Sequence, residues 1–503
     1  MSARRGGPNL IACSSAEPFQ PVLFTDTAFL LRFLPTVLAL FFLAVALTPK
    51  RWKTDGRRFT LPNTVLLAGS VVFLALGTGL FMRWVVGAVV FNYLVALAIG
   101  RARLVAASAS RPGPLPEALL TLGVTGNVVL LGVSKFALPL PVLFADRGFA
   151  VPQLLAPLGL TFFVCHALSY LADVARGDAP AQASPIRASL YLLCFPLLCG
   201  GPLARYSDMS PQLAQRRATL AAFAFGVRRW LVGYCKVVFL AAAVAGPVDI
   251  VFATPAAELG MARAWLGAVC FTLQIYFDLS GYADMAIGFG RMFGFRFVEN
   301  FRAPYLAGSL TEFWRRWNIT LLDWCRRYLH LALTPKHAGA WARARQAGLL
   351  LLCVSVWHGP GSTVLVWGGL HGAIVIAEQA WLGKRLARLP AVLRHAYLLL
   401  VVLLLWVVFR AESLPGASVV LVAMSGLGHA VDIADAVPIA LTPWFWSMLG
   451  FGVLSISPLW QSGGRWLVTV DALTTSILIL ISTSFVYMWR RLVNTARFLT
   501  GRR

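Results

Sequence analysis

The chain has 503 residues, of which 58% are hydrophobic and only 13% are charged. Soluble domains carry about 25% charged residues, so this composition excludes an ordinary soluble enzyme and a disordered chain. The 44 basic and 20 acidic residues give a net charge of +24, but the basic residues stand in short clusters between apolar runs, as in multi-span membrane proteins, so nucleic acid is not an expected partner.

Apolar runs of membrane-spanning length follow one another along most of the chain. Residues 1–21 are expected to form a polar N-terminal extension, and 22–503 a single membrane-embedded domain. A membrane helix needs about 20 apolar residues, and some runs are too short or too interrupted to span alone. We therefore predict an all-α polytopic membrane protein with about eleven transmembrane helices, plus re-entrant or interfacial helices. The candidate runs are 28–48, 62–81, 84–100, 117–138, 150–172, 188–204, 219–246, 262–284, 345–358, 362–382, 393–410, 441–458 and 472–489.

The basic clusters predict how the spans are oriented. They follow the first, third and fifth candidate runs and fill the C-terminal tail, as in Lys50-Arg51, Arg101, Arg176 and Arg490-Arg491. Because short cytoplasmic loops carry an excess of Lys and Arg, this pattern places the N-terminus outside and the C-terminus in the cytoplasm. An odd number of spans follows.

The segment 285–345 departs from the pattern of apolar runs. It holds too many arginines for a span and too many aromatic residues for a free loop, among them Trp314, Arg315, Arg316 and Trp317. An amphipathic or re-entrant cytoplasmic segment satisfies both facts. Its aromatic residues would anchor it in the headgroup layer, or the segment would form the wall of a cavity that accepts an anionic donor, and the two roles are compatible.

His358 is the leading candidate for chemistry. It stands in VSVWHGPGS (354–362), between two apolar runs, where Gly359 and Pro360 interrupt the helix. Ionisable groups at membrane depth are costly and point to function, and a broken backbone is tolerated there only where it is buried in protein or lines a cavity. A role in helix packing or hydrogen bonding is the better expectation for His371, although it could act as a second catalytic group.

Two carboxylates occur in another apolar stretch, at Asp278 and Asp284. They could form an acid–base pair, but we expect them to pair with arginines such as Arg291, Arg302 or Arg315. None of the eight cysteines forms a C-x-x-C pair, and most are expected to be small buried hydrophobic residues. Phosphate-loop, zinc and nucleophile-elbow motifs are missing from the sequence, so no metal is expected.

Three long motifs resemble the membrane-bound O-acyltransferase family. They are QIYFDLSGYADMAIGFGRMFGFRFVENFRAPY (274–305), SLTEFWRRWNITLLDWCRRYLHL (309–331) and VWHGPGSTVLVWGGLHG (356–372). The chain most resembles the bacterial branch that O-acetylates alginate, and the similarity extends clearly over about residues 22–430. The family implies a ring of helices around a central tunnel, with the catalytic core here at about 270–375.

The resemblance also implies the roles of individual residues. The invariant histidine of the family corresponds to His358, and a second catalytic position corresponds to Asn318, where the polysaccharide branch usually has histidine. We expect His358 to take the proton of the acceptor hydroxyl and Asn318 to orient the acceptor or the carbonyl oxygen. Donor-binding or tunnel-lining roles are expected for Trp314, Arg315, Arg316, Trp317, Trp357, Asp278, Ser280, Tyr282 and His371.

The implied activity is transfer of acetyl groups from a cytoplasmic thioester towards an alginate- or cellulose-like exopolysaccharide. The donor would be acetyl-CoA or an acyl-carrier thioester, with no tightly bound cofactor. The resemblance places the enzyme in the bacterial inner membrane, where a periplasmic or membrane-anchored acetyltransferase would complete the transfer. Three alternatives stay open: transfer of D-alanyl or another acyl group to a cell-envelope polymer, a transporter or channel, and a scaffold without catalysis.

Overall fold

The computed structural model describes residues 24–48, 59–108, 114–136, 159–330, 339–359, 361–427 and 443–456. Every regular element in these ranges is helical, which confirms the expected all-α class. The chain divides into two compact units, Met1–Leu449 and Gly450–Arg503, and helix α22 (Pro443–Ile456) crosses the boundary between them. The expected extension 1–21 lies outside the described residues, and the single domain over 22–503 stays a prediction.

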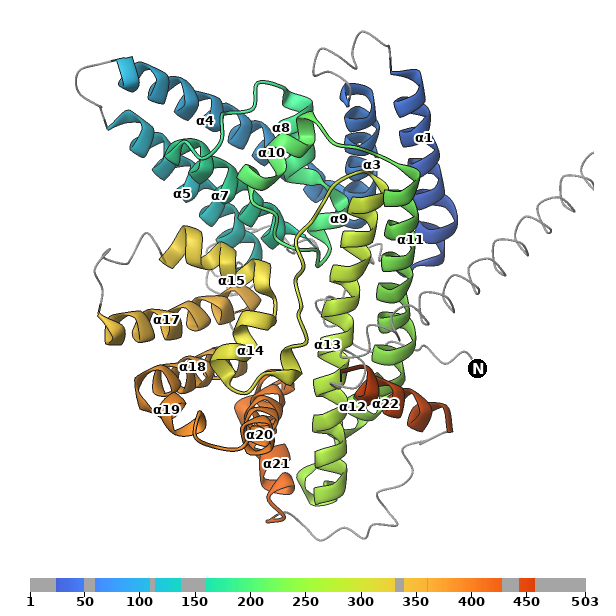
Figure 1. The fold of residues 1–503 in the computed structure, drawn as a ribbon, viewed down its shortest axis with the longest axis vertical. Helices are drawn as coiled ribbons and strands as arrows, with labels where there is room; N and C mark the ends of the chain where they lie inside the picture. Colours follow the sequence, from blue (N-terminus) through green and yellow to red (C-terminus); the bar gives the residue numbers. More distant parts are fainter. Residues whose placement is uncertain are drawn as a thin grey trace, which may run out of the picture. The chain divides into compact units, whose positions relative to one another are not determined.

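The N-terminal helices of the first unit pack in two groups, seen at the upper right and upper left of Figure 1. One group joins α1 (Leu34–Leu47), preceded by a π-helical turn (Phe29–Phe33), to α3 (Thr60–Thr78). The other consists of α4 (Met82–Ser108), α5 (Leu115–Phe136) and α7 (Leu160–Arg176). Buried phenylalanine rings with centroids 5.1 to 6.3 Å apart tie the first group to later helices: Phe24, Phe29, Phe73, Phe195 and Phe289.

Short helices connect these groups to a long central pair. The expected run 188–204 is interrupted at Cys194, which leaves the helical conformation just before Pro196 and separates α8 (Pro185–Leu193) from α9 (Phe195–Leu198). After α10 (Tyr206–Ala214), the chain forms one long apolar rod from α11 (Leu220–Cys235) through a π-helical turn (Lys236–Ala241) into α12 (Ala242–Ala253). This rod packs along α13 (Met261–Met292), as the vertical pair in Figure 1 shows.

Two pairs of glycines allow α11 and α13 to approach closely. A β-carbon added at Gly226 would lie 2.6 Å from the carbonyl oxygen of Gly288, and one added at Gly233 would lie 2.5 Å from that of Gly281. The two pairs lie about two helical turns apart, and their order along the chain shows that α11 and α13 are antiparallel. Helices in lipid associate through such close van der Waals packing, because lipid tails are as apolar as leucine side chains.

The C-terminal helices of this unit gather on the other side of α13, at the lower left of Figure 1. Here α18 packs on α17 and α20, and α20 packs on α13 and α21. The elements are α14 (Leu310–Arg316), α15 (Ile319–Cys325), a π-helical turn (Arg326–His330), α17 (Ala340–His358), α18 (Ser362–Ala377), a π-helical turn (Glu378–Leu382), α19 (Gly383–Leu386), α20 (Ala391–Arg410) and α21 (Leu414–Met424).

Seven helices in the described ranges are long and apolar enough to cross a membrane. They coincide with seven of the expected runs: Phe29–Leu47, Thr60–Thr78, Met82–Ser108, Leu115–Ser134, Leu220–Ala253, Ser362–Leu386 and Ala391–Arg410. The expected span 472–489 lies outside the described residues, so the total of about eleven stays a prediction. The polytopic architecture itself is confirmed.

The glycine seam between α11 and α13 generates a stability prediction. Replacement of Gly226 by alanine would force a methyl group against the backbone of Gly288, which must then shift. We expect Gly226→Ala to lower the free energy of unfolding by about 1 to 3 kcal/mol, measured as a lower melting temperature of the detergent-solubilised protein.

The matched control is Gly87→Ala on α4, where an added β-carbon meets no atom within 4 Å. Equal melting temperatures for the two variants would show that the close approach of α11 and α13 does not stabilise the fold.

Candidate active site

His358 is the last residue of α17, and α18 begins at Ser362, so the predicted helix break is present. The imidazole is half-buried and is surrounded by aromatic edges. Its ring centroid lies 4.8 Å from that of Trp357, 5.5 Å from Phe409 and 5.9 Å from Trp367, each at a steep angle. At the end of α17, the His358 imidazole therefore contacts rings of α18 and α20.

The rings around His358 belong to a larger cluster, which we call the aromatic box: His358, Trp314, Trp317, Trp367, His371, Trp406 and Phe409. Trp367 stacks nearly parallel on Trp406 at 5.6 Å, and Trp406 lies 5.2 Å from Trp317. His371 is fully buried in the box, 4.6 Å from Trp367 and 5.3 Å from Trp314. Its Nδ1 is 2.9 Å from the carbonyl oxygen of Trp367, which is the hydrogen-bonding role expected for it.

Asn318 stands at a sharp corner between α14 and α15. Its backbone has φ 44° and ψ 51°, in the left-handed region that few residues other than glycine adopt. Asn, Asp and His are the side chains most often tolerated there. Asn318 follows Trp317 directly in the chain, and ring contacts run from Trp317 through Trp406 and Trp367 to His358. Asn318 is thus next in sequence to a residue of the aromatic box, and its catalytic role stays a prediction.

The N-terminus of α14 fixes where this corner lies. The Ser309 hydroxyl caps α14 by accepting from the Glu312 N–H at 3.1 Å, and the Glu312 carboxylate accepts from the N–H of Gly308 at 2.8 Å. The Glu378 carboxylate, from the turn after α18, accepts from the N–H groups of Leu310 and Thr311 at 2.8 Å each. A buried carboxylate at a helix N-terminus is favoured by the helix dipole. Glu378 therefore ties the short helix that carries Trp314 to the helix that carries His371.

A cavity of about 660 Å³ has Trp314 in its wall. Four arginines, Arg205, Arg315, Arg326 and Arg327, contribute to its wall, and apolar side chains form the rest. The full lining is Arg205, Thr311, Trp314, Arg315, Leu322, Asp323, Arg326, Arg327, Ala347, Leu350, Leu351, Val375 and Gln379. We call it the arginine cavity. Trp314 belongs to both, so the arginine cavity shares with the aromatic box an indole that contacts His371.

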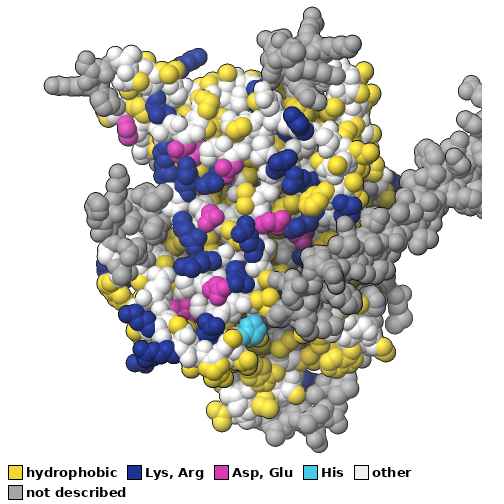
Figure 2. Space-filling view, in the orientation of Figure 1, with side chains coloured by type: hydrophobic (Ala, Val, Ile, Leu, Met, Phe, Trp, Pro, Cys, Tyr) yellow, Lys and Arg dark blue, Asp and Glu magenta, His cyan; other side chains and the backbone are white. Residues whose placement is uncertain are grey.

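Three of the four arginines are held by carboxylates. Arg205 Nε lies 2.7 Å from Asp208, Arg326 lies 3.0 Å from Asp323, and Arg327 Nη2 lies 2.8 Å from Asp178. Arg315 is exposed, and it makes no ion pair with any residue that the structure describes. Figure 2 shows basic side chains gathered over the middle of one face, with acidic side chains between them and hydrophobic ones towards the rim.

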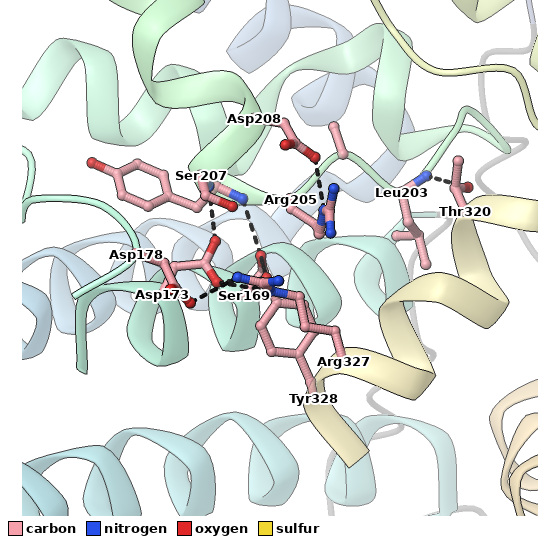
Figure 3. Close-up of polar contacts among 12 residues, drawn as sticks. Ser169, Asp173, Asp178, Leu203, Arg205, Ser207, Asp208, Thr320, Arg327 and Tyr328 are labelled. Atoms are coloured by element: carbon pink, nitrogen blue, oxygen red, sulfur yellow. Dashed lines mark hydrogen bonds and ion pairs between the residues drawn. The ribbon is translucent and has the colours of Figure 1, made fainter. Parts of the chain in front are cut away.

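A buried polar cluster anchors one wall of the arginine cavity (Figure 3). The Tyr328 hydroxyl donates to the fully buried Asp173 at 2.7 Å and lies 2.8 Å from the Ser169 hydroxyl. Asp173 also accepts from the N–H of Ser207 at 2.8 Å. Burial raises the pKa of Tyr328, so its hydroxyl stays protonated and available as a donor. The cluster joins α7 to the loop of Arg205 and to the turn of Arg327.

The acidic residues on α13 have different partners from those predicted. Asp284 pairs with Arg229 and Lys236 of the α11 rod, each with an N···O distance of 2.6 Å, and Arg229 also reaches Glu299 at 2.6 Å. The expected partners Arg291, Arg302 and Arg315 are therefore wrong for Asp284, because α11 presents its basic side chains to this side of α13.

Asp278 lies one and a half turns before Asp284 and is buried, without an ion pair to any described residue. Ser280 and Tyr282 are buried on the same helix, and the Tyr282 ring lies against Phe24 at 6.0 Å. The residues predicted at 278–282 thus pack inside the helix bundle, and their contacts do not reach the aromatic box. Their binding roles stay predictions.

Between α13 and residue 330, the described part of the segment 285–345 contains the short helices α14 and α15 and buries most of its tryptophans. Trp314, Trp317 and Trp324 are each at most 5% exposed, so they pack in the protein interior and not in the headgroup layer. Glu312 pairs with Arg316 across one helical turn, as its spacing predicted. Of the two compatible interpretations, the cavity wall fits the contacts, because Arg315, Arg326 and Arg327 line the arginine cavity.

Several residues of the site were missed by the sequence interpretation. Trp406 and Phe409 lie in an apolar span, where nothing in the pattern distinguishes them from lipid-facing residues. Arg205 lies far from the three motifs in sequence, and Glu378 lies just after the third, and both meet the motif 309–331 only through the fold. Asn300 lies inside the motif 274–305, but its burial and its contacts become visible only in the fold.

Comparison with known proteins identifies the family of this chain. The model of the MBOAT, membrane-bound O-acyltransferase family matches residues 151–414, which include both short motif helices and His358. The chain is 37% identical over 414 residues to the probable alginate O-acetylase AlgI of Azotobacter vinelandii, covering 81% of this chain and 79% of that protein. It is 30% identical to the peptidoglycan O-acetyltransferase of Helicobacter pylori, covering 81% and 80%.

A more distant relative is the teichoic acid D-alanyltransferase of Bacillus subtilis, at 23% identity over 44% of this chain and 59% of that protein. The family match covers more than half of the chain, and the alginate O-acetylase similarity covers most of it. The chain therefore belongs to the membrane-bound O-acyltransferase family and is a multi-pass membrane acyltransferase.

Proposed function

We propose that this enzyme transfers acetyl groups from a cytoplasmic thioester, acetyl-CoA, for O-acetylation of an exopolysaccharide of the alginate type. The observation that carries the proposal is the position of the arginine cavity, which lies one indole away from the box that holds His371 and His358. The names of the relatives, which act on alginate and peptidoglycan, support acetyl as the acyl group.

In the proposed reaction, the neutral imidazole of His358 takes the proton of the acceptor hydroxyl while its oxygen attacks the thioester carbonyl. The tetrahedral intermediate then collapses, the carbon–sulfur bond breaks, and the imidazolium returns its proton to the leaving thiolate. An imidazole has an unperturbed pKa near 6.5, so it can carry the proton in both directions around neutral pH. The Asn318 amide would donate to the developing oxyanion or orient the acceptor.

The arginine cavity suits the anionic part of the donor. Its arginines would hold phosphate oxygens through charge-assisted hydrogen bonds, which are stronger than neutral ones. Since Arg205, Arg326 and Arg327 already contact carboxylates, Arg315 is the guanidinium most available to a donor phosphate. The apolar part of the wall, with Leu350, Leu351 and Val375, would accept the uncharged arm of the donor.

The orientation of the cavity supports a cytoplasmic donor. Arg103 and Arg176 belong to the basic clusters for which we expect a cytoplasmic position. Arg176 donates to the carbonyl oxygen of Arg327 at 3.1 Å, and Arg103 donates to that of Val174 at 2.8 Å. The arginine cavity thus lies at the same end of α7 as these clusters. We place the enzyme in the inner membrane with its N-terminus outside, and a periplasmic or membrane-anchored acetyltransferase would complete the transfer.

Transfer of a D-alanyl group from a carrier protein is the less favoured alternative, because that relative matches only 44% of the chain. Membership in an acyltransferase family argues against the transporter interpretation. A catalytically inactive scaffold would rest on Asn318 alone, and its left-handed backbone suits asparagine as well as histidine.

The first prediction from this proposal concerns His358. We expect His358→Ala to lower the rate of acetyl transfer by about 10²- to 10⁴-fold, because the acceptor hydroxyl loses its base. Transfer of radiolabelled acetyl from acetyl-CoA to the polymer fraction of membranes measures the rate, normalised to enzyme level. His395→Ala, on α20 outside the aromatic box, is the matched control and should keep full activity. Unchanged transfer by His358→Ala would overturn the assignment.

The second prediction concerns Asn318. Histidine accepts the left-handed backbone and offers a polar ring, so Asn318→His should retain or raise activity. Asn318→Leu offers neither property and should lose most transfer in the same assay. Complete loss of transfer in Asn318→His, at normal protein level, would instead show that the reaction requires an amide at this position.

The third prediction concerns the donor. Arg315→Gln should raise the KM for acetyl-CoA about tenfold and leave the maximal rate nearly unchanged, because one charge-assisted contact is lost on binding. Arg101→Gln, an exposed charge near the cytoplasmic end of α4, serves as control. An unchanged KM in Arg315→Gln, together with a normal maximal rate, would remove Arg315 from the donor site.

A further inference from the structure

Backbone strain in the described residues concentrates around Asn318. Apart from glycines, two described residues have positive φ angles, Ala303 at 47° and Asn318 at 44°. Both lie in the same small structure, formed by residues 300–303 and 316–320. Residues held in this region cost free energy and persist only where the surrounding contacts enforce them, which is typical of functional sites.

Asn300 makes the contacts that enforce the corner. Its backbone carbonyl accepts from the N–H of Ile319 at 2.9 Å, and its side-chain oxygen accepts from the N–H of Thr320 at 3.1 Å and from the Thr320 hydroxyl at 2.8 Å. On the other side, the N–H of Arg302 donates to the carbonyl of Arg316 at 2.9 Å. Asn300 is only 5% exposed, so these bonds form away from solvent. These hydrogen bonds join the segment 300–302 to residues 316, 319 and 320, and Trp317 and Asn318 form the turn between them.

The same residue links the corner to both neighbouring parts of the site. The Thr320 hydroxyl, which donates to Asn300, accepts from the N–H of Leu203 at 2.9 Å, in the loop that leads to Arg205 of the arginine cavity. On the other side, Glu299 pairs with Arg229, which pairs with Asp284 of α13. Asn300 thus follows directly on a residue that is paired to the α11–α13 helices, while its own side-chain oxygen holds Thr320.

We propose that Asn300 is a positioning residue for acyl transfer, acting through the left-handed corner at Asn318. It touches neither donor nor acceptor in this role. Its amide oxygen holds Thr320, and the held backbone aims the Asn318 side chain at the reacting carbonyl. The inference rests on the proposed function of Asn318. A misplacement of about 1 Å far from the chemistry can lower a rate by about 100-fold, so the corner need not unfold for activity to fall.

The first test separates positioning from folding. Asn300→Ala removes the acceptor oxygen, and Asn300→Asp keeps it. We expect Asn300→Ala to lower the maximal rate of acetyl transfer by about 10- to 100-fold, with the KM for acetyl-CoA unchanged, and Asn300→Asp to restore most of the rate. Thr320→Val should reproduce the loss, and Thr320→Ser should not.

The matched control is Asn63→Ala. Asn63 is a fully buried asparagine on α3 whose amide donates to the carbonyl of Leu213 at 2.9 Å, away from the site. Its loss should lower the melting temperature in detergent but leave the rate per folded enzyme unchanged. If Asn300→Ala also changes only the melting temperature, Asn300 is a structural residue and the proposal is overturned.

The second test asks whether Asn300 acts through Asn318. The double variant Asn300→Ala with Asn318→Ala should be no slower than Asn318→Ala alone. Once the Asn318 side chain is removed, the loss of Asn300 can no longer misplace it. Losses that multiply would overturn the proposal, since Asn300 would then act by another route. Full activity in Asn318→Ala alone would instead contradict the proposed role of Asn318 itself, independently of Asn300.

Discussion

The close approach of α11 and α13 is the constraint on which the site depends. Lipid gives two apolar helices little reason to associate, so backbone contact at the Gly226–Gly288 and Gly233–Gly281 pairs supplies the packing. That contact brings Arg229 and Lys236 within reach of Asp284, and it neutralises a carboxylate that would be costly alone. The chain leaving α13 then starts from a fixed point. Glu299 extends the ion-pair network, and the next residue, Asn300, reaches the corner at Asn318.

The site combines an unusual amount of aromatic surface with few charges. The aromatic box buries His371 fully and surrounds the half-buried His358, whereas four arginines line the arginine cavity, which has Trp314 in its wall. This separation suits a reaction whose donor carries phosphates that must be bound and a thioester that must be protected from hydrolysis. The polar cluster of Asp173, Ser169 and Tyr328 gives the cavity wall a rigid support, because each buried polar atom in it has a partner.

Much of the fold was predictable from sequence, because hydrophobic runs of spanning length carry a strong signal. The break after His358 was also predictable, since Gly359 and Pro360 interrupt a helix whatever surrounds them. The ion-pair partners of the buried carboxylates were not predictable. Asp284 was expected to pair with arginines that follow it in the chain, yet its partners come from α11, because only packing decides which helix faces α13. Trp406 and Phe409 were not recognised for the same reason. The sequence of a span does not distinguish an aromatic residue that faces lipid from one that faces the site.

The left-handed backbone at residue 318 also restricts how this enzyme can change over time. Apart from glycine, the residues best tolerated there are asparagine, aspartate and histidine. The codons of these three residues differ from one another by a single first-position base. A lineage can therefore move between an amide, a carboxylate and an imidazole at this corner without passing through a residue that the backbone rejects. The fold thereby keeps a small set of polar groups within mutational reach of one another, while it closes the position to apolar and β-branched side chains.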